Sequence, residues 1–485
     1  MGKRSRSSFA RRRVALVALG AALGAVLGYG GATFQLTRPA AVTREPERPG
    51  AARLEYEPPP RTRVPLGLAA DAVRKVRDLT TPEVLELTEQ IHLAKGFALS
   101  NVGIVVTSEG VVLVDTTESP ETGVAVAEAL RELTEQPVHT IVYTHYHPDH
   151  PQGTAAFAQP GLRIIATDDF VELTRHQNEL LGAFHLRARA NQSGAAAPAH
   201  SFALPVERNP FGAFGRKIAV VMPTVTFADR YDFELGGKRF ELFHTSGETP
   251  DHLAMWLPDD RALFVGDLYY ASFPNLSTPM LEPRPVQGWI RSLSRFIELE
   301  PELLIPSHTR PIRGAEAVRE VLTGYRAAIQ HVLDETVRCI EEGKTVDQAV
   351  AEIALPERLR NLPYLEEGYG RVSWSVRGIY RGFTGWYDGH GTGLDPLPPR
   401  HRARELVTLA GGADSVLARA IELQRAGEHQ LCAELCDAVI DANGQDRLAH
   451  RIKAESLRAL AFAGNNLNAF GFYRSAYALE MAAAE

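Results

Sequence analysis

At 485 residues the chain is too long for one ordinary domain, so we expect two or three domains with separate hydrophobic cores. Hydrophobic residues make up 45% of the chain and charged residues 23%, the balance of an ordinary globular protein. The formal net charge is −7, and this composition argues against a nucleic-acid partner, which would call for a basic face or stripe.

The first 37 residues have the pattern of an export signal or a membrane anchor. Residues 1–13 are basic, and residues 14–37 are mostly apolar and carry no charge. This run is longer than a usual signal core and close to the ~20 residues that cross a bilayer. The segment could therefore be a signal peptide that is cleaved or a membrane anchor that is retained. The positive-inside rule then predicts an exported protein on the periplasmic or extracellular face, with possible membrane attachment through residues 14–37.

Residues 38–74 are rich in Pro and Arg and are typical of an extended linker. The following segment, residues 75–315, interleaves strand and helix patterns, which favours a layered α/β domain. Alternating residues around a turn predict hairpins over 97–117, 230–247 and 253–268, and helical spacing predicts a helix over 121–136. Further strands are predicted over 138–144, 163–170 and 216–227.

Residues 316–485 have a helical pattern instead. Amphipathic spacing predicts helices over 314–343 and 345–355, and four more helix-like segments run from about residue 402 to the end. The three cysteines, Cys339, Cys432 and Cys436, are too few for a disulfide framework, and we interpret them as buried packing residues. Such a helical segment more often packs or dimerises than catalyses a reaction.

The stretch THYHPDH, residues 144–150, holds four possible metal ligands within six positions. His145 and His147 are two residues apart at the end of a predicted strand, so both imidazoles can point the same way. Asp149 and His150 follow in the loop. This set of nitrogen and oxygen ligands suits zinc, and two ions fit it better than one because a single ion cannot easily use all four from so tight a loop.

The motif His-x-His-x-Asp-His after a strand, preceded by VVLVDT (111–116) and a helix, resembles the metallo-β-lactamase superfamily. The resemblance implies an α/β fold, an αββα sandwich with a dinuclear zinc site at one sheet edge. It also implies which residues bind the two Zn²⁺ ions of each chain. One ion would be held by His145, His147 and Glu248, the other by Asp149, His150 and His308, and Asp267 would bridge them.

Glu248 stands where the superfamily usually has a histidine, and this is similar to the alkylsulfatase branch. Residues 362–399 also resemble the start of the all-α dimerisation domain of that branch. The resemblance implies a homodimeric hydrolase that cleaves a small amphiphilic sulfate ester into an alcohol and sulfate. The nucleophile would be a metal-activated water, which Asp149 would also orient.

The sequence departs from this branch around the anion pocket. The arginine expected soon after Asn275-Leu276 is absent, so that the nearest one is Arg284, and Leu333 stands where a histidine is expected. Tyr369 remains in place. We therefore expect Arg284 and Tyr369 to bind the sulfate oxygens, because arginine presents a planar fork to an oxyanion.

Three neighbouring residues, Asp115, His244 and His252, are expected to support the site from outside the ligand set. Two other functions stay open. The altered anion pocket is compatible with a hydrolase of another ester, a lactone or a thioester on the same scaffold. A membrane-tethered, non-catalytic assembly protein is disfavoured, because a decayed enzyme has no reason to keep seven ligands.

Overall fold

The computed structural model describes residues 54, 56–58, 76–195, 197, 216–280 and 284–485, and all of them belong to one compact unit, Leu54–Glu485. The predicted signal or anchor (1–37) lies outside the described residues, as does most of the predicted linker (38–74). Within the described part of the chain, no helix combines the length and apolar character needed to cross a membrane.

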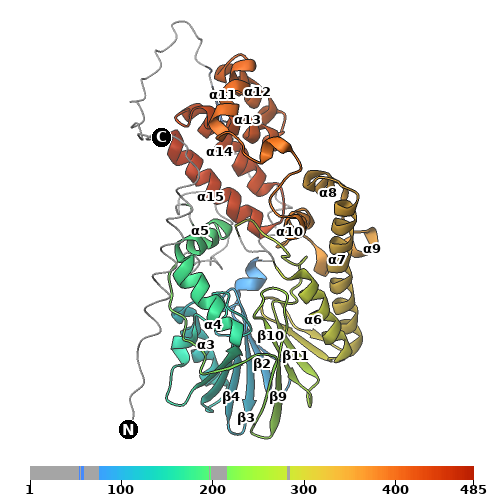
Figure 1. The fold of residues 1–485 in the computed structure, drawn as a ribbon. Helices are drawn as coiled ribbons and strands as arrows, with labels where there is room; N and C mark the ends of the chain where they lie inside the picture. The colour runs from blue at the N-terminus through green and yellow to red at the C-terminus, as the bar shows by residue number, and fades with distance from the viewer. Residues whose placement is uncertain (1–53, 55, 59–75, 196, 198–215, 281–283) are drawn as a thin grey trace, which may run out of the picture. The chain divides into compact units, whose positions relative to one another are not determined.

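Two β-sheets are formed by the strands between Glu83 and Arg313 (Figure 1). The first sheet runs in chain order through β1 (Glu83–Glu86), β2 (Ile91–Lys95), β3 (Val102–Thr107), β4 (Gly110–Val114), β5 (Val138–Val142), β6 (Arg163–Thr167) and β7 (Val225–Phe227). The second has the order β13 (Ile312–Arg313), β12 (Leu303–Pro306), β11 (Ala262–Gly266), β10 (Leu253–Leu257), β9 (Lys238–His244) and β8 (Arg230–Leu235).

The sheets pack face to face, and helices cover the outer face of each. Val112 and Ile165 of the first sheet meet Phe240 and Met255 of the second in one buried cluster. The outer face of the first sheet is covered by α3 (Pro120–Leu133) and α4 (Asp168–Arg175), and that of the second by α6 (Val286–Glu298) and α7 (Ala315–Glu341). The predicted αββα sandwich is confirmed.

Most predicted elements of this domain are present, and two strand predictions are wrong in extent. The strand predicted over 163–170 ends at Thr167, because Asp168 and Asp169 begin α4, where acidic side chains favour a helix N-terminus. Of the strand predicted over 216–227 only Val225–Phe227 pairs, since Pro223 lacks the N–H that a ladder needs. The π-helical turn His176–Leu180 and α5 (Gly182–Gln192) were not predicted.

The rest of the chain is helical, which confirms an all-α second part. Its helices are α8 (Val346–Glu352), α9 (Glu357–Arg360), α10 (Val372–Thr384), α11 (Pro399–Leu409), α12 (Ala413–Arg425), α13 (His429–Ala442), α14 (Arg447–Phe462) and α15 (Leu467–Ala484). Five helices rather than four therefore follow residue 398. Cys339, Cys432 and Cys436 are free and buried, as predicted for packing residues.

Helix α15 packs against α5 and so joins the two parts of the chain. Gly471 allows the close approach, because a Cβ there would lie 1.8 Å from the Gln192 carbonyl oxygen. The side chain of Gln192 donates to Asn468 Oδ1 at 2.9 Å. Asn466 Nδ2 contacts the carbonyl oxygens of Glu367 and Tyr369 at 2.9 and 3.0 Å, which holds the loop before α10 against α15.

Candidate metal centre

The seven predicted ligands lie in loops at one edge of the two sheets. The motif with His145, His147, Asp149 and His150 follows β5, Asp267 follows β11, and His308 follows β12. Glu248 lies in the connection between β9 and β10. Because β11 and β12 run parallel, their carboxyl ends meet at the same edge, which brings Asp267 and His308 together.

All seven side chains take part in groups whose ligand atoms lie within 4.8 Å of one another. The three groups are His145, His150 and Asp267; Asp149, His150 and His308; and His147, Glu248 and Asp267. Asp267 belongs to two of the groups, the position that a bridging carboxylate would need. The predicted division of the other six ligands between two ions stays a prediction.

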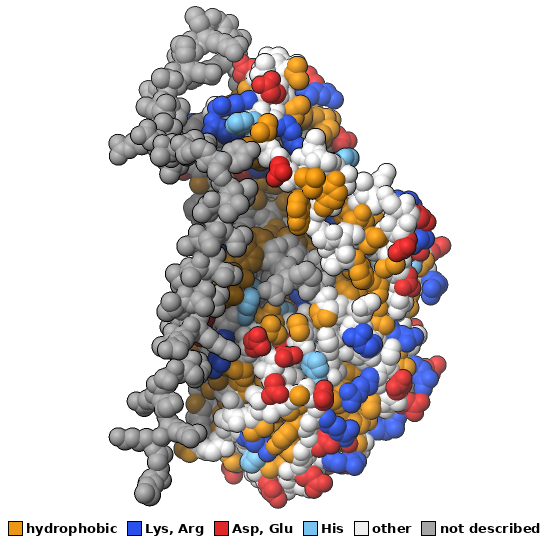
Figure 2. All heavy atoms as spheres, viewed as in Figure 1, with side chains coloured by type: hydrophobic (Ala, Val, Ile, Leu, Met, Phe, Trp, Pro, Cys, Tyr) orange, Lys and Arg blue, Asp and Glu red, His pale blue; other side chains and the backbone are white. Residues whose placement is uncertain are grey.

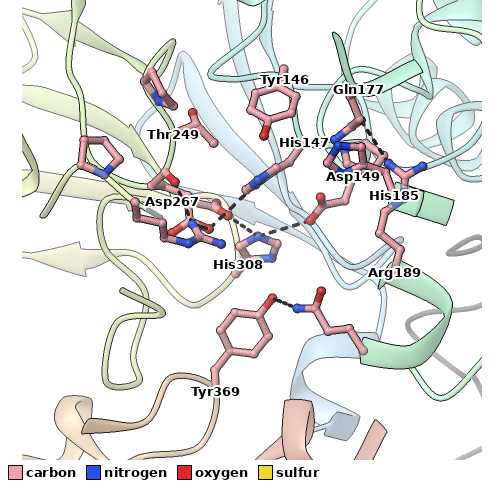
Figure 3. A pocket seen from close by; sticks show the side chains of 16 residues that line it. Tyr146, His147, Asp149, Gln177, His185, Arg189, Thr249, Asp267, His308 and Tyr369 are labelled. Atoms are coloured by element: carbon pink, nitrogen blue, oxygen red, sulfur yellow. Dashed lines mark hydrogen bonds and ion pairs between the residues drawn. The ribbon is translucent and has the colours of Figure 1, made fainter. Parts of the chain in front are cut away.

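The contacts within this set are short. His145 Nε2 lies 2.8 Å from His147 Nδ1, and His308 Nε2 lies 3.0 Å from Asp267 Oδ2. His150 Nε2 is 3.5 Å from Asp149 Oδ2 and 3.6 Å from Asp267 Oδ2. Figure 3 shows His147, Asp149, Asp267 and His308 converging on one small space.

Three atoms of the set test whether metal ions fit. His150 Nε2, Glu248 Oε2 and Asp267 Oδ1 are buried and have no hydrogen-bond partner among the described residues. Buried polar atoms without a partner are rare, because leaving one unsatisfied is costly. Imidazole nitrogens and carboxylate oxygens in this arrangement suit a borderline cation such as zinc, so the residues present fit a metal centre.

The electrostatics of the histidines also fit a cation. Burial lowers the pKa of His147 to about 3 and that of His145 well below its usual value, so both rings are neutral, the form that binds metal. Burial would do the same to His308, but the charge and hydrogen bond of Asp267 together with the charge of Asp149 outweigh burial and raise the pKa of His308 to about 9. The carboxylates of the site thus attract positive charge, as they would attract a metal ion.

Asp115 supports the centre from behind, as predicted. Its carboxylate accepts hydrogen bonds from the Thr144 N–H at 2.8 Å and from Ser307 Oγ at 3.1 Å, and its Oδ2 lies 2.8 Å from His150 Nδ1. It is fully buried, and its φ of 63° is unusual for a residue other than glycine. Asp115 therefore connects the loops after β5 and β12 and orients His150.

His244 and His252 lie outside the three ligand groups found among the described residues, and their supporting role stays a prediction. His244 Nε2 lies 2.6 Å from the Pro250 carbonyl oxygen. His252 is buried, and its Nε2 accepts from the backbone N–H of Asp267 at 3.1 Å. The ring of His252 thus helps to place the Asp267 loop.

A pocket opens beside the ligands and contains the two predicted sulfate contacts, Arg284 and Tyr369. Arg284 donates to the Glu248 carbonyl oxygen at 2.8 Å and forms an ion pair with the Glu248 carboxylate. Burial raises the pKa of Tyr369, which keeps its phenol protonated. Gln192 donates to Tyr369 Oη at 3.2 Å, so that the Tyr369 O–H remains able to donate into the pocket. Leu333 does not line this pocket and packs in the core around α7.

A polar wall that was not predicted from the sequence faces the ligands. Its side chains come from the π-helical turn and α5: Gln177, His185, Arg189 and Gln192. The stretch FHLRARANQ, residues 184–192, has no clear apolar periodicity, so no helix was predicted there. The packing of α5 against α15 holds the Gln192 end of this wall in place.

Two family models match the chain. The Metallo-beta-lactamase superfamily model matches residues 96–161 and 176–308, and the Alkyl sulfatase dimerisation model matches residues 345–482. A linear primary-alkylsulfatase of a Pseudomonas species is 35% identical over 75% of this chain and 71% of its own length. The chain belongs to the alkylsulfatase family of the metallo-β-lactamase superfamily. As a member of this family it is a hydrolase, which argues against the non-catalytic assembly protein.

More distant relatives of this alkylsulfatase-family chain agree. An (R)-specific secondary-alkylsulfatase of Pseudomonas sp. is 26% identical over 79% of this chain and 60% of its own length. An alkyl/aryl-sulfatase of Saccharomyces cerevisiae is 25% identical over 78% of this chain and 61% of its own. The solved structure of an inverting sec-alkylsulfatase from Pseudomonas sp. matches the fold with a TM-score of 0.76 at 23% identity, over 82% of this chain and 66% of that one.

Proposed function

We propose that the protein is a dinuclear zinc hydrolase that cleaves alkyl sulfate esters to an alcohol and sulfate. The observation that carries this proposal is the pocket itself, where five of the seven ligand-type side chains lie beside Arg284 and Tyr369, with the other two, His145 and His150, in contact with them behind. The printed names of the relatives, primary, secondary and alkyl/aryl-sulfatases, support the substrate class.

In this proposal His145, His147 and Glu248 hold one zinc ion, Asp149, His150 and His308 hold the other, and Asp267 bridges them. Two bound ions would activate a water molecule for attack and stabilise the negative charge that develops in the transition state. Asp149 lies 3.5 Å from both His150 and His308 and lines the pocket, so its carboxylate is placed to orient the attacking water. Asp115 keeps the His150 ring in the orientation that ligation needs.

Tyr369 and Arg284 would bind the sulfate group. The Tyr369 O–H can donate to a sulfate oxygen because its contact with Gln192 uses the phenol oxygen as an acceptor, which leaves the hydroxyl hydrogen available. Arg284 brings a buried positive charge beside Glu248, and its side chain is only 6% exposed. Hydrogen bonds from a guanidinium to an oxyanion are strong when water is excluded.

Sulfate release from dodecyl sulfate tests the proposal. The zinc-loaded protein should release sulfate, and His147→Ala should abolish the release while the variant keeps its melting temperature within a few degrees. Metal content is measured for both proteins. No sulfate from a wild-type protein that holds two zinc ions per chain would contradict the proposal.

A second candidate function is the hydrolysis of a neutral ester, lactone or thioester at the same centre. It is favoured by Leu333, which stands in the core where the family resemblance predicts a polar sulfate contact. A panel of a p-nitrophenyl ester, a lactone and a thioester separates the two functions. Turnover of any of these above that of dodecyl sulfate would support the second.

The helical part is proposed to form a homodimer. The segment from the end of α10 through α11 exposes large hydrophobic side chains, and hydrophobic side chains gather on the helical part of the surface in Figure 2. They include Phe383, Trp386 (74% exposed), Leu394, Leu397 (70%), Leu406 and Leu409 (82%). So many neighbouring exposed apolar side chains indicate an association surface. Light scattering should give twice the mass of one chain.

We propose that the protein is exported, with residues 14–37 as a signal or an anchor. The support is the basic start followed by an uncharged, largely apolar run. Cell fractionation of the full chain tests this, because a retained anchor sends the activity to the membrane fraction and a cleaved signal sends it to the soluble exported fraction. Activity confined to the cytoplasm would contradict export.

A further inference from the structure

Two arginines line the pocket, and they differ in how their charges are neutralised. Arg284 is paired with the carboxylate and the carbonyl oxygen of Glu248. Arg189, from α5, is buried to 7% exposure, yet it forms no ion pair with a carboxylate among the described residues. The Nε of Arg189 also has no hydrogen-bond partner among the described residues. A buried guanidinium in this state is costly unless another group supplies the missing contacts.

The side chain of Arg189 is held in place on the pocket wall. Its Nη1 donates to Gln177 Oε1 at 3.1 Å, and Gln177 is itself only 7% exposed. Because Gln177 accepts through Oε1, its amide N–H groups remain as further donors on the same wall. Figure 3 shows Arg189, Gln177 and His185 on the Asp149 side of the pocket, with Tyr369 on another side. The wall therefore presents donors and positive charge.

Among the described residues, Asp149 is the carboxylate whose charge acts on Arg189. Burial lowers the pKa of Arg189, and the Asp149 charge opposes this effect only in part. Asp149 is also a proposed zinc ligand, and a carboxylate that coordinates a cation has less charge left for a second partner. When metal is bound, Asp149 therefore neutralises Arg189 less than it does in the metal-free protein. An anion from solution or from the substrate would then stabilise Arg189 more strongly.

We propose that Arg189, positioned by Gln177, is a further sulfate-binding residue, so that the substrate's sulfate group contacts this guanidinium in addition to Arg284 and the Tyr369 O–H. The inference rests on the proposed function and names the group that selects a sulfate ester within it. Arginine suits this role because its planar fork can donate two parallel hydrogen bonds to two sulfate oxygens. It also supplies a polar contact in a chain where the expected arginine is found only at Arg284 and the expected histidine is replaced by Leu333.

Binding of 1-decanesulfonate tests this assignment without turnover, because its C–S bond is not a sulfate ester. The dissociation constant is measured by calorimetry on zinc-loaded wild type, Arg189→Gln, Arg189→Lys and Arg187→Gln. Arg189→Gln should weaken binding about 10- to 100-fold, the range expected for loss of charged hydrogen bonds. Arg189→Lys should recover part of the loss, since it keeps the charge without the fork. Arg187 is exposed on the same helix, and Arg187→Gln should bind as wild type does.

A second variant that keeps Arg189 tests the assignment even if Arg189→Gln does not fold. Gln177→Glu would place a carboxylate beside the guanidinium and should also weaken sulfonate binding about tenfold, with metal content unchanged. Unchanged binding in Arg189→Gln and Gln177→Glu, with two zinc ions retained, would overturn the assignment of Arg189 alone. A zinc-loaded wild type that turns over a neutral ester but does not bind the sulfonate would instead overturn the proposed function.

Discussion

The two walls of the pocket are built in different ways. The metal wall comes from loops at the ends of β5, β11 and β12 and from the β9–β10 connection, all within the sandwich. The anion wall comes from α5, from the loop before α10 and from their contacts with α15. The metal wall therefore comes from the sandwich domain alone, whereas the anion wall combines Arg189 and Gln192 of that domain with Tyr369 of the helical part. Changes in the two walls should have separable effects.

The largest effect is expected from removal of Asp267, the carboxylate that belongs to two of the three ligand groups. Asp267→Ala should lower the bound zinc below two ions per chain and reduce sulfate release to the level of the chelator-treated protein, because no other carboxylate lies in both groups. Metal analysis and the sulfate assay check this on the same sample. Full activity with two ions bound to the variant would show that Asp267 does not bridge.

A smaller effect on zinc binding is expected when Asp115, which contacts the ligand His150, is changed. Asp115→Asn keeps the volume but removes the charge that accepts from Thr144, Ser307 and His150, so zinc affinity should fall about 10- to 100-fold. Competition with a chromophoric chelator measures the affinity. Excess zinc should restore most of the activity. A zinc affinity equal to that of wild type would contradict the orienting role of Asp115.

The anion wall should respond to the packing of α15. Gly471→Ala would place a methyl group against the Gln192 carbonyl oxygen, so α5 and α15 must separate. Overpacking of this kind costs ~1–3 kcal/mol of stability, and the KM for dodecyl sulfate should rise while zinc content stays at the wild-type level.

Gly464→Ala is the matched control, because the nearest atom to its added Cβ lies 3.8 Å away. If Gly471→Ala lost zinc but kept the wild-type KM, the prediction that changes in the two walls affect metal binding and substrate binding separately would be wrong.

The smallest effect on catalysis is expected at the proposed dimer surface. Trp386→Asp combined with Leu397→Asp puts charge on exposed apolar positions far along the chain from the metal ligands. The variant should shift from dimer to monomer in light scattering and keep its kcat per zinc site within about twofold, since exposed substitutions are usually mild. A stable dimer would exclude this surface as the interface.

The sequence was most informative where local spacing determines position. The hairpins were predicted from alternation and turn residues, and the seven ligands follow from one compact motif and three single positions after or between strands. The structure brings all seven together. The family resemblance, which identified Glu248, Asp267 and His308, was needed because spacing alone cannot relate residues about a hundred positions apart.

The sequence was least informative for the anion wall. Arg189 and Gln192 lie in a helix without a clear apolar pattern, and Gln177 lies in a π-helical turn that no propensity predicts. Their position depends on a glycine contact with α15, almost 300 residues away along the chain. A buried arginine without a carboxylate is a feature of the packed structure and cannot be recognised from sequence.

The central claim is that the pocket selects a sulfate ester. The most direct measurement compares kcat/KM for dodecyl sulfate and dodecyl acetate, two esters of the same alcohol, with one zinc-loaded preparation. We expect the sulfate ester to be preferred by at least about tenfold, because each charged hydrogen bond to the sulfate contributes roughly 1.5–3 kcal/mol. Preference for the acetate by a protein that holds both ions would contradict the account.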